Sequence, residues 1–135
     1  MINQFVAVNA RVYRLTRGRI GNKVKGAPVL LLDHVGRKSG QTRTAPLLYL
    51  RDGADIVIVA SRGGSDATPA RWVNLQANPA TTVQIGRQRP PAVARVATAD
   101  EKARLWPRLV EMYPDYAVYQ TRTERQIPVV ILSPA

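Results

Sequence analysis

Three tyrosines, Tyr113, Tyr116 and Tyr119, recur at three-residue spacing near the end of the chain. On a helix this spacing spreads the phenols across about 120° of one side. A phenol joins a large apolar ring to a hydroxyl that needs a partner, so such a wall suits a flat aromatic ligand. Core packing is the ordinary explanation for this pattern. We favour a pocket because the chain has only two Trp, five Tyr and one Phe, and three of these lie here.

Two glycine-containing segments could bring backbone N–H groups and a cation to a ligand. The first, residues 36–40 (GRKSG), places two cations and a hydroxyl between glycines, as an anion site requires. The second, residues 61–64 (SRGG), follows an apolar strand pattern. Neither has the spacing of a Walker A loop or a dinucleotide fingerprint. Taken alone, each is explained equally well or better as a surface turn.

Other catalytic chemistry has little support. The chain has no cysteine and one histidine, His34, which excludes thiol redox chemistry and disfavours a zinc site. Asp33 precedes His34, but neighbours on a strand face opposite sides, which disfavours an acid–base pair. The remaining candidate carboxylates lie near helix starts or beside cations, where capping and surface pairing explain them; they are Asp100, Glu101, Asp115 and Glu124.

The charge balance calls for an anionic partner. Lys and Arg number 20 against 9 acids, a net charge of +11, and residues 1–45 hold nine of the cations with Asp33 as their only acid. The length of 135 residues favours one domain. No run of about 18 apolar residues occurs, and residues 1–18 lack a signal-peptide core, so we expect a cytoplasmic protein.

The pattern predicts an arm and a body. Residues 2–18 read as an amphipathic helix with a wholly cationic polar side, followed by a glycine-rich connection at 17–26. We therefore expect a cationic arm over residues 1–25 and a barrel domain over 26–135. In the body, strands are predicted at 29–32, 43–50, 55–61, 81–85, 92–97 and 127–132, and helices at 69–77, 98–112 and 114–123. These elements indicate an α+β fold built on an antiparallel six-stranded β-barrel with flanking helices.

Several separated blocks, in order, resemble the deazaflavin-dependent nitroreductase family of actinobacteria. The resemblance runs from about residue 28 to the C-terminus. Its blocks are 30–32 (LLL), 36–40 (GRKSG), 43–47 (RTAPL), 59–64 (VASRGG), Trp72, 74–75 (NL), 78–79 (NP), 113–120 (YPDYAVYQ) and 126–129 (QIPV). The resemblance implies a split β-barrel like that of FMN-binding oxidoreductases, with reduced coenzyme F420, an 8-hydroxy-5-deazaflavin, as hydride donor.

The resemblance also implies residue roles. Lys38 and Arg43 would bind the phosphate and the oligoglutamate tail of the cofactor, and Arg37 and Ser39 would shape the loop. The cofactor would be flanked by Pro46, Ser61, Arg62 and Gly63, with Trp72 nearby. Tyr113, Tyr116 and Tyr119 would line the acceptor pocket, Ser61 would orient the acceptor, and Leu48 lies where an acceptor-side residue varies in the family.

The expected reaction is hydride transfer from reduced F420 to a quinone, a nitroaromatic or an activated enone, with Tyr119 or solvent supplying the proton. The arm could lie on an anionic membrane or pack over the barrel mouth. Split barrels commonly form homodimers, unless the arm covers that surface. Two alternatives stay open: a deazaflavin carrier without turnover, and a small basic nucleic-acid-binding barrel. The latter is disfavoured because the predicted strands carry only Tyr49 as an aromatic residue.

Overall fold

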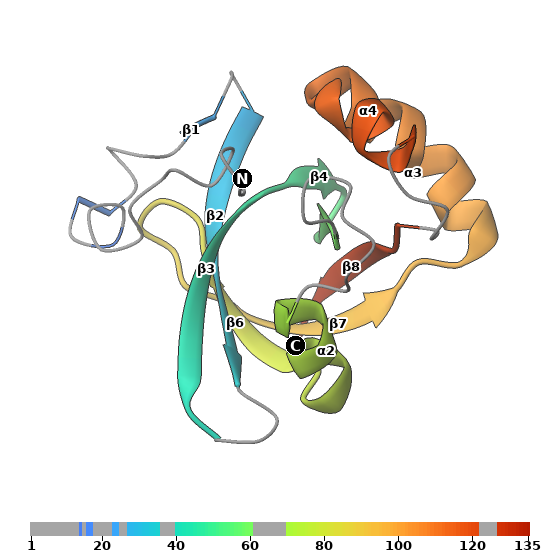
Figure 1. Ribbon diagram of the computed structural model, residues 1–135. Coiled ribbons are helices and arrows are strands. Elements are labelled where there is room, and N and C mark those ends of the chain that lie inside the picture. Colours follow the sequence, from blue (N-terminus) through green and yellow to red (C-terminus); the bar gives the residue numbers. More distant parts are fainter. Residues whose placement is uncertain are drawn as a thin grey trace.

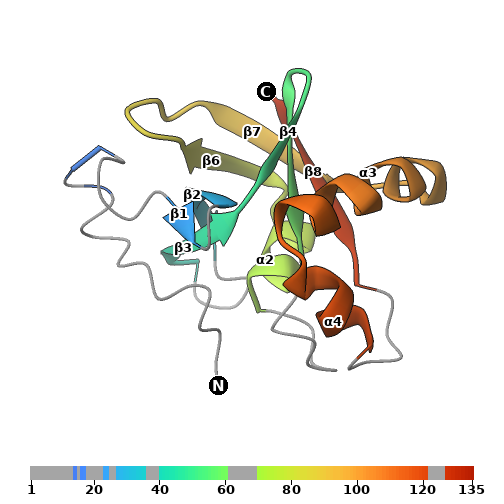
Figure 2. The same cartoon turned by 90° about the horizontal axis from the view of Figure 1, so that it is seen from above.

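The structure, a computed structural model, describes residues 14, 16–17, 23–24, 27–35, 40–60, 70–121 and 127–135. Figure 1 shows strands that curve around one centre, with α3 and α4 together on one side and α2 across one end; Figure 2 shows the same arrangement from above. Of the predicted arm, only residues 14, 16–17 and 23–24 are described, and the helix predicted there otherwise lies outside the described residues.

The described elements comprise eight strands and three helices. The strands are β1 (Lys23–Val24), β2 (Ala27–Val35), β3 (Thr42–Leu48), β4 (Leu50–Asp52), β5 (Asp55–Val59), β6 (Ala80–Gln84), β7 (Pro91–Val96) and β8 (Val129–Pro134). The helices are α2 (Ala70–Ala77), α3 (Ala99–Met112) and α4 (Asp115–Thr121). None of the described helices is long and apolar enough to cross a membrane.

Every strand pairing is antiparallel, and the strands follow the order β1-β2-β6-β7-β8-β5-β4, with β3 also paired to β2. β3 pairs with β2 and β4 pairs with β5, so the continuous segment 42–52 closes the ring by changing partners at Tyr49. The Tyr49 N–H donates to the Pro28 carbonyl at 3.2 Å at this break. If β3 and β4 are counted as one bent strand and the two-residue strand β1 is left aside, the barrel has six strands. The prediction of an antiparallel six-stranded barrel is therefore confirmed.

Local signals in the sequence account for the turns and helix ends. The predicted Asp52-Gly53 hairpin joins β4 to β5, and Gly53 has φ +62°, which glycine adopts without strain. α3 begins with a capping box: the Thr98 hydroxyl accepts from the Glu101 N–H, and the Glu101 carboxylate accepts from the Thr98 N–H. All three helices predicted in the body are present, with ends shifted by one or two residues.

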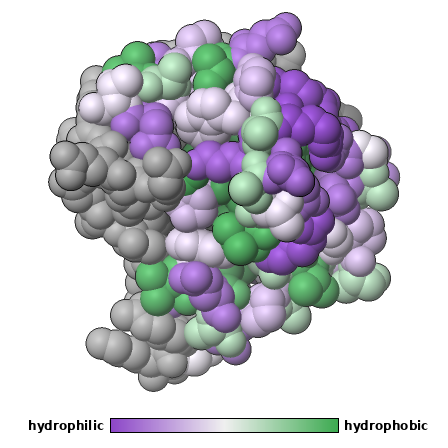
Figure 3. Space-filling view, turned by 90° about the vertical axis from the view of Figure 1, so that its right-hand side faces the viewer, coloured by the Kyte–Doolittle hydropathy of each residue, from purple (hydrophilic) through white to green (hydrophobic). Residues whose placement is uncertain are grey.

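The buried side chains form two clusters, divided by the alternation of β2. Val29 and Leu31 belong to one cluster, and Leu30 and Leu32 to the other. The tyrosine cluster contains Ala27, Val29, Leu31, Leu48, Val57, Val59, Leu105, Leu109, Tyr113, Tyr116, Tyr119, Ile127, Val129 and Ile131. The tryptophan cluster contains Leu30, Leu32, Leu47, Tyr49, Ile56, Ile58, Ala60, Trp72, Leu75, Val83, Ala92, Ala94, Val130 and Leu132. Helices α3 and α4 therefore cover one face of the sheet. Figure 3 shows the side of the molecule on which these two helices lie, and hydrophilic side chains cover much of it.

Candidate active site

The three tyrosines lie where α3 gives way to α4. Tyr113 is the C-cap of α3, with an extended backbone (φ −144°), and its N–H donates to the Leu109 carbonyl at 2.9 Å. Pro114 follows, and α4 restarts with the Tyr116 N–H donating to the Tyr113 carbonyl at 3.1 Å. This turn keeps Tyr113 on the same side as Tyr116 and Tyr119 although it belongs to the preceding helix.

The three rings pack against one another and against the sheet. Tyr113 and Tyr116 meet edge to face with centroids 5.0 Å apart, and Tyr116 and Tyr119 do so at 6.1 Å. Their exposed fractions are 2% for Tyr113, 4% for Tyr116 and 8% for Tyr119. All three tyrosines are therefore part of the core, Tyr119 is the most accessible of them, and their role as the wall of an acceptor pocket stays a prediction.

The tyrosine hydroxyls are joined to one another. The Tyr113 and Tyr119 hydroxyl oxygens lie 3.3 Å apart, and both side chains are buried. The pKa of Tyr113 is raised above its ordinary value, chiefly by burial, then by Tyr119, and further by the negative charge and hydrogen bonding of Asp115. The Tyr113 phenol therefore stays protonated over the whole working range of an enzyme.

Two further predicted residues lie on the same face of the sheet as the tyrosines. Leu48 is buried and belongs to the tyrosine cluster. Pro46, half-buried, lies opposite Leu31 in the β2–β3 ladder, and directly opposed residues share a face. Because Leu31 also belongs to the tyrosine cluster, Pro46, Leu48 and the tyrosines share one face.

Trp72 is placed elsewhere. It is buried on α2 within the tryptophan cluster, beside Leu30 and Leu32 rather than Val29 and Leu31. The structure does not bring Trp72 together with the tyrosines, and its place near the cofactor stays a prediction. Its position in a short predicted helix favours packing over a place in the wall of the acceptor pocket, and its burial in the tryptophan cluster agrees with that.

Most of the predicted cofactor-binding loops lie outside the described residues. These are Arg37, Lys38 and Ser39, between β2 and β3, and Ser61, Arg62 and Gly63, between β5 and α2. Arg43 is described in its backbone, which pairs with His34. The roles of these seven residues stay predictions.

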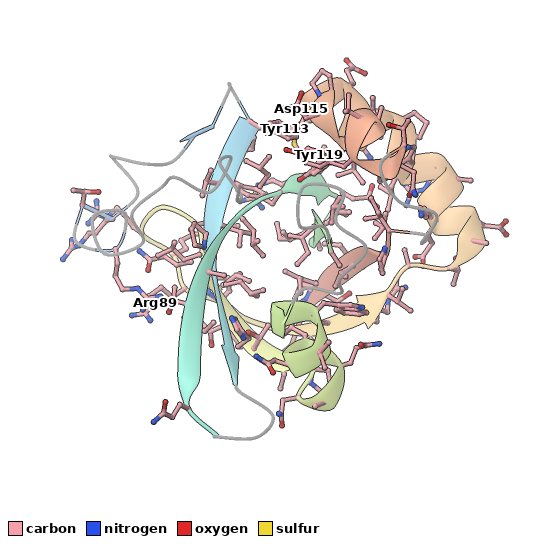
Figure 4. All side chains as sticks on the ribbon, in the orientation of Figure 1. Arg89, Tyr113, Asp115 and Tyr119 are labelled. Carbon is pink, nitrogen blue, oxygen red and sulfur yellow. The ribbon has the colours of Figure 1, made fainter. Side chains whose placement is uncertain are left out.

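Asp33 has partners that sequence reasoning missed. Its carboxylate accepts from the Thr44 hydroxyl at 2.7 Å and from Arg14 at 3.3 Å, and Arg89 lies 3.9 Å away (Figure 4 labels Arg89). Arg14 also donates through Nε to the buried Gln84 side chain at 3.0 Å. The Arg14 side chain therefore contacts both β2 and β6. The one available signal was that Asp33 is the only acid among residues 1–45.

His34 faces the other way, as the alternation of a strand requires. Its Nδ1 lies 3.0 Å from Nδ2 of Asn74 on α2, and both side chains are buried. Asp33 and His34 therefore contact different residues from opposite faces of β2.

Comparison with known proteins places the chain in a family. The sequence model described as F420H(2)-dependent quinone reductase matches residues 5–134, so the likeness includes most of the arm as well as the barrel. A protein of Mycobacterium tuberculosis (strain ATCC 25618 / H37Rv), provisionally named an F420H(2)-dependent quinone reductase, is 50% identical over 110 residues, covering 82% of this chain and 92% of the relative.

Solved structures agree with this placement. The structure of an F420-H2 dependent reductase, FDR-A, superposes with a TM-score of 0.73 at 39% identity and covers 78% of this chain and 94% of its own. A second structure, described as a domain-swapped dimer, gives a TM-score of 0.75 at 36% identity over 92% of this chain and 94% of its own. With its split β-barrel and its match over residues 5–134, the chain belongs to the F420H(2)-dependent quinone reductase family.

Proposed function

We propose that this chain is an oxidoreductase that transfers a hydride from reduced coenzyme F420 to a quinone. The observation that carries the proposal is the family match over residues 5–134, joined to a wall of three tyrosines on one face of the barrel. The cofactor supplies the hydride chemistry when it is bound. The chain then has to hold two flat molecules in contact and keep water from them.

The described residues fit such a cofactor in two respects. A flat ring needs apolar and aromatic neighbours, and the tyrosines, Leu48 and Pro46 are gathered on a single face of the sheet, with Tyr119 and the half-buried Pro46 the more accessible of them. A phosphate and an oligoglutamate tail need cations, and the net charge of +11 supplies an excess of them. We assign the tail to Lys38 and Arg43, with Arg37 and Ser39 shaping the loop and Ser61, Arg62 and Gly63 beside the ring.

The acceptor side is assigned to the tyrosines and Ser61. Tyr119 combines a hydroxyl with the largest exposed fraction of the three tyrosines, so we assign it to hydrogen bonding with the acceptor oxygen. A site that recognises a flat ring and one oxygen also suits nitroaromatics and activated enones. Quinones remain the first choice because the family description names them.

Anaerobic oxidation of reduced F420 tests the function. Cofactor oxidation on addition of menadione, followed by absorbance, supports the quinone reductase. Stoichiometric binding without oxidation by menadione or a nitroimidazole would instead support the deazaflavin carrier. DNA competition at rising salt addresses the nucleic-acid alternative, because non-specific DNA binding weakens steeply with salt.

The arm at residues 1–25 has a role of its own in this proposal. Two roles are equally open in it: a peripheral contact with an anionic membrane on the cytoplasmic face, which the cationic amphipathic helix predicted from the sequence would suit, and packing over the barrel. The second arrangement, packing over the barrel, is supported by the contacts of Arg14 with Asp33 and Gln84. Pelleting with vesicles of anionic lipid decides between them: deletion of residues 1–25 abolishes pelleting if the arm binds the membrane and leaves it unchanged if it does not.

A homodimer is the assembly we propose. The relative described as a domain-swapped dimer supports it, since that chain superposes over 92% of this one. Light scattering at several protein concentrations tests the proposal. A mass near 14.9 kDa at every concentration would contradict it.

A further inference from the structure

A cavity opens at one end of the barrel. It has a volume of about 100 Å³ and lies between the β4–β5 hairpin, the β6–β7 hairpin and the end of β8. Figure 2 shows the β4–β5 hairpin and the C-terminus together at this end, with α2 farther down in that view. The cavity is therefore the end of the barrel interior that α2 does not cover.

The cavity is apolar inside and exposed at its mouth. Its floor is formed by buried side chains of the tryptophan cluster, among them Ile56, Val83 and Leu132. Its rim is formed by exposed residues, among them Pro90 and Pro134. Because such a floor offers water few hydrogen-bond partners, an apolar group is the better occupant.

Arg51 supplies a positive charge at the mouth. It lines the cavity and is exposed, and its guanidinium carbon lies 5.8 Å from the centre of the Tyr49 ring. The adjacent acid, Asp52, is bound by Arg104 and Arg108 instead. Among the residues that the structure describes, the Arg51 side chain makes no ion pair, so its charge is available to an anion.

Gln88 adds a second polar group at the mouth. It is exposed on the β6–β7 hairpin and lines the cavity. Its backbone exchanges two hydrogen bonds with that of Ile85, at 2.9 Å and 3.1 Å, which fix its position beside the cavity. The amide of its side chain is able to donate to an oxygen atom. Each of the two hairpins therefore contributes a polar donor to the same opening.

We propose that this cavity binds a small monocarboxylate, with the apolar body on the floor and the carboxylate at Arg51 and Gln88. A guanidinium suits a carboxylate because its planar N–H groups pair with both oxygens. The volume limits the apolar body to roughly five carbon atoms, since an apolar cavity of about 150 Å³ holds benzene. The floor belongs to the tryptophan cluster and not to the tyrosine cluster, so this site is separate from the candidate active site and independent of the proposed function.

Methyl NMR on the whole chain tests the site, with hexanoate as the probe. In protein labelled with 13C at the isoleucine δ1 methyls, hexanoate is expected to shift Ile56 and Ile85, which line the cavity, in a saturable way. Ile127 and Ile131, which belong to the tyrosine cluster, should keep their positions. The absence of a saturable shift at Ile56 and Ile85, or equal shifts at all four residues, would overturn the proposal.

The role of the charge is tested with a neutral probe. Hexan-1-ol has the same chain without a carboxylate, and we expect it to bind about tenfold more weakly than hexanoate. Arg51→Gln should remove this difference by weakening hexanoate alone. Arg87→Gln is the matched control, because Arg87 is an exposed cation on the neighbouring hairpin and is not part of the lining. Equal affinities for the two probes in the unaltered protein, or an equal loss of hexanoate binding in both variants, would overturn the proposal.

The role of the cavity is tested by narrowing its mouth. Ala54 lines the cavity but is exposed in the β4–β5 hairpin, so Ala54→Leu adds bulk without disturbing a buried position. Both probes should bind about tenfold more weakly to this variant. Unchanged affinity for both would show that they bind elsewhere and would overturn the proposal.

Discussion

At the residue scale, the three tyrosines act as one unit because their rings touch and two of their hydroxyls are joined. Tyr113 is the most buried of the three, and its hydroxyl lies 3.3 Å from that of Tyr119. Burial also raises the pKa of Tyr113, which keeps the phenol neutral. Removing one hydroxyl therefore changes the hydrogen bonding of its partner while the apolar packing of the rings remains.

Tyr119→Phe is expected to lower turnover with menadione by about tenfold or more, because it removes the hydroxyl assigned to the acceptor. Affinity for oxidised F420 should stay nearly unchanged, since the ring and its packing are kept. Stopped-flow absorbance gives the turnover and fluorescence titration gives the affinity. Tyr49→Phe, which removes a phenol hydroxyl from the tryptophan cluster, serves as control. A variant at residue 119 that cannot bind cofactor would show that the role is wrongly assigned.

At the element scale, contacts at the start and along the middle of α3 help to determine where the tyrosines lie. Its start carries the Thr98–Glu101 capping box. Further along, Arg104 and Arg108 both contact the Asp52 carboxylate at the β4–β5 hairpin, at 2.8 Å and 3.1 Å. Since Tyr113 ends this helix, both sets of contacts help to position the tyrosines against the sheet.

The Asp52 contact predicts a pH-dependent stability. Hydrogen bonding from Arg104, followed by Arg108, lowers the pKa of Asp52 to about 2 from 3.8. Because the folded value is the lower one, the stabilisation is present above about pH 4 and is lost as the pH falls towards 2. Asp52→Asn should lower the melting temperature by about 3 °C at pH 7. Calorimetry should find this difference shrinking between pH 4 and pH 2; a difference that stays constant would contradict the assignment.

Loss of the capping box should weaken the whole fold slightly. In Thr98→Ala the Glu101 N–H loses its acceptor, so the free energy of unfolding should fall by about 1 kcal/mol. Urea denaturation measures this fall. Thr98→Ser keeps the hydroxyl and should restore most of the stability. A Ser variant as weak as the Ala variant would show that the hydroxyl is not the cause.

Local sequence patterns predicted most of these elements, but they did not predict which distant segments of the chain pair with one another. The hairpin at Gly53 and the starts of α2 and α3 follow from residues within one turn of each site. The break at Tyr49 does not, because both sides of it carry strand-forming residues and only the barrel requires the bend.

The candidate site shows the same division. The three tyrosines, Pro46 and Leu48 share a face, while the roles that the family resemblance gives them stay predictions. Trp72 does not join them, and the contacts of Asp33 with Arg14 and Arg89 join residues that are 19 and 56 positions apart in the chain. Such partners depend on which strands lie side by side, and periodicity in a sequence carries no information about that.

At the scale of the whole molecule, charge is the dominant feature. A net charge of +11 repels itself, and an anionic cofactor relieves part of that repulsion. Affinity for F420 should therefore weaken as salt rises, since exposed charges are screened over about 10 Å at 0.1 M and about 3 Å at 1 M. Titrations at the two salt concentrations measure the effect. The same affinity at both would contradict a tail held by cations.

The most direct test of the central claim is a binding titration with oxidised F420, with FMN in parallel. We predict saturable, stoichiometric binding of F420 and markedly weaker binding of FMN, because FMN has a single phosphate and no oligoglutamate tail for the cations to hold. Equal or tighter binding of FMN, or no binding of F420, would contradict the account.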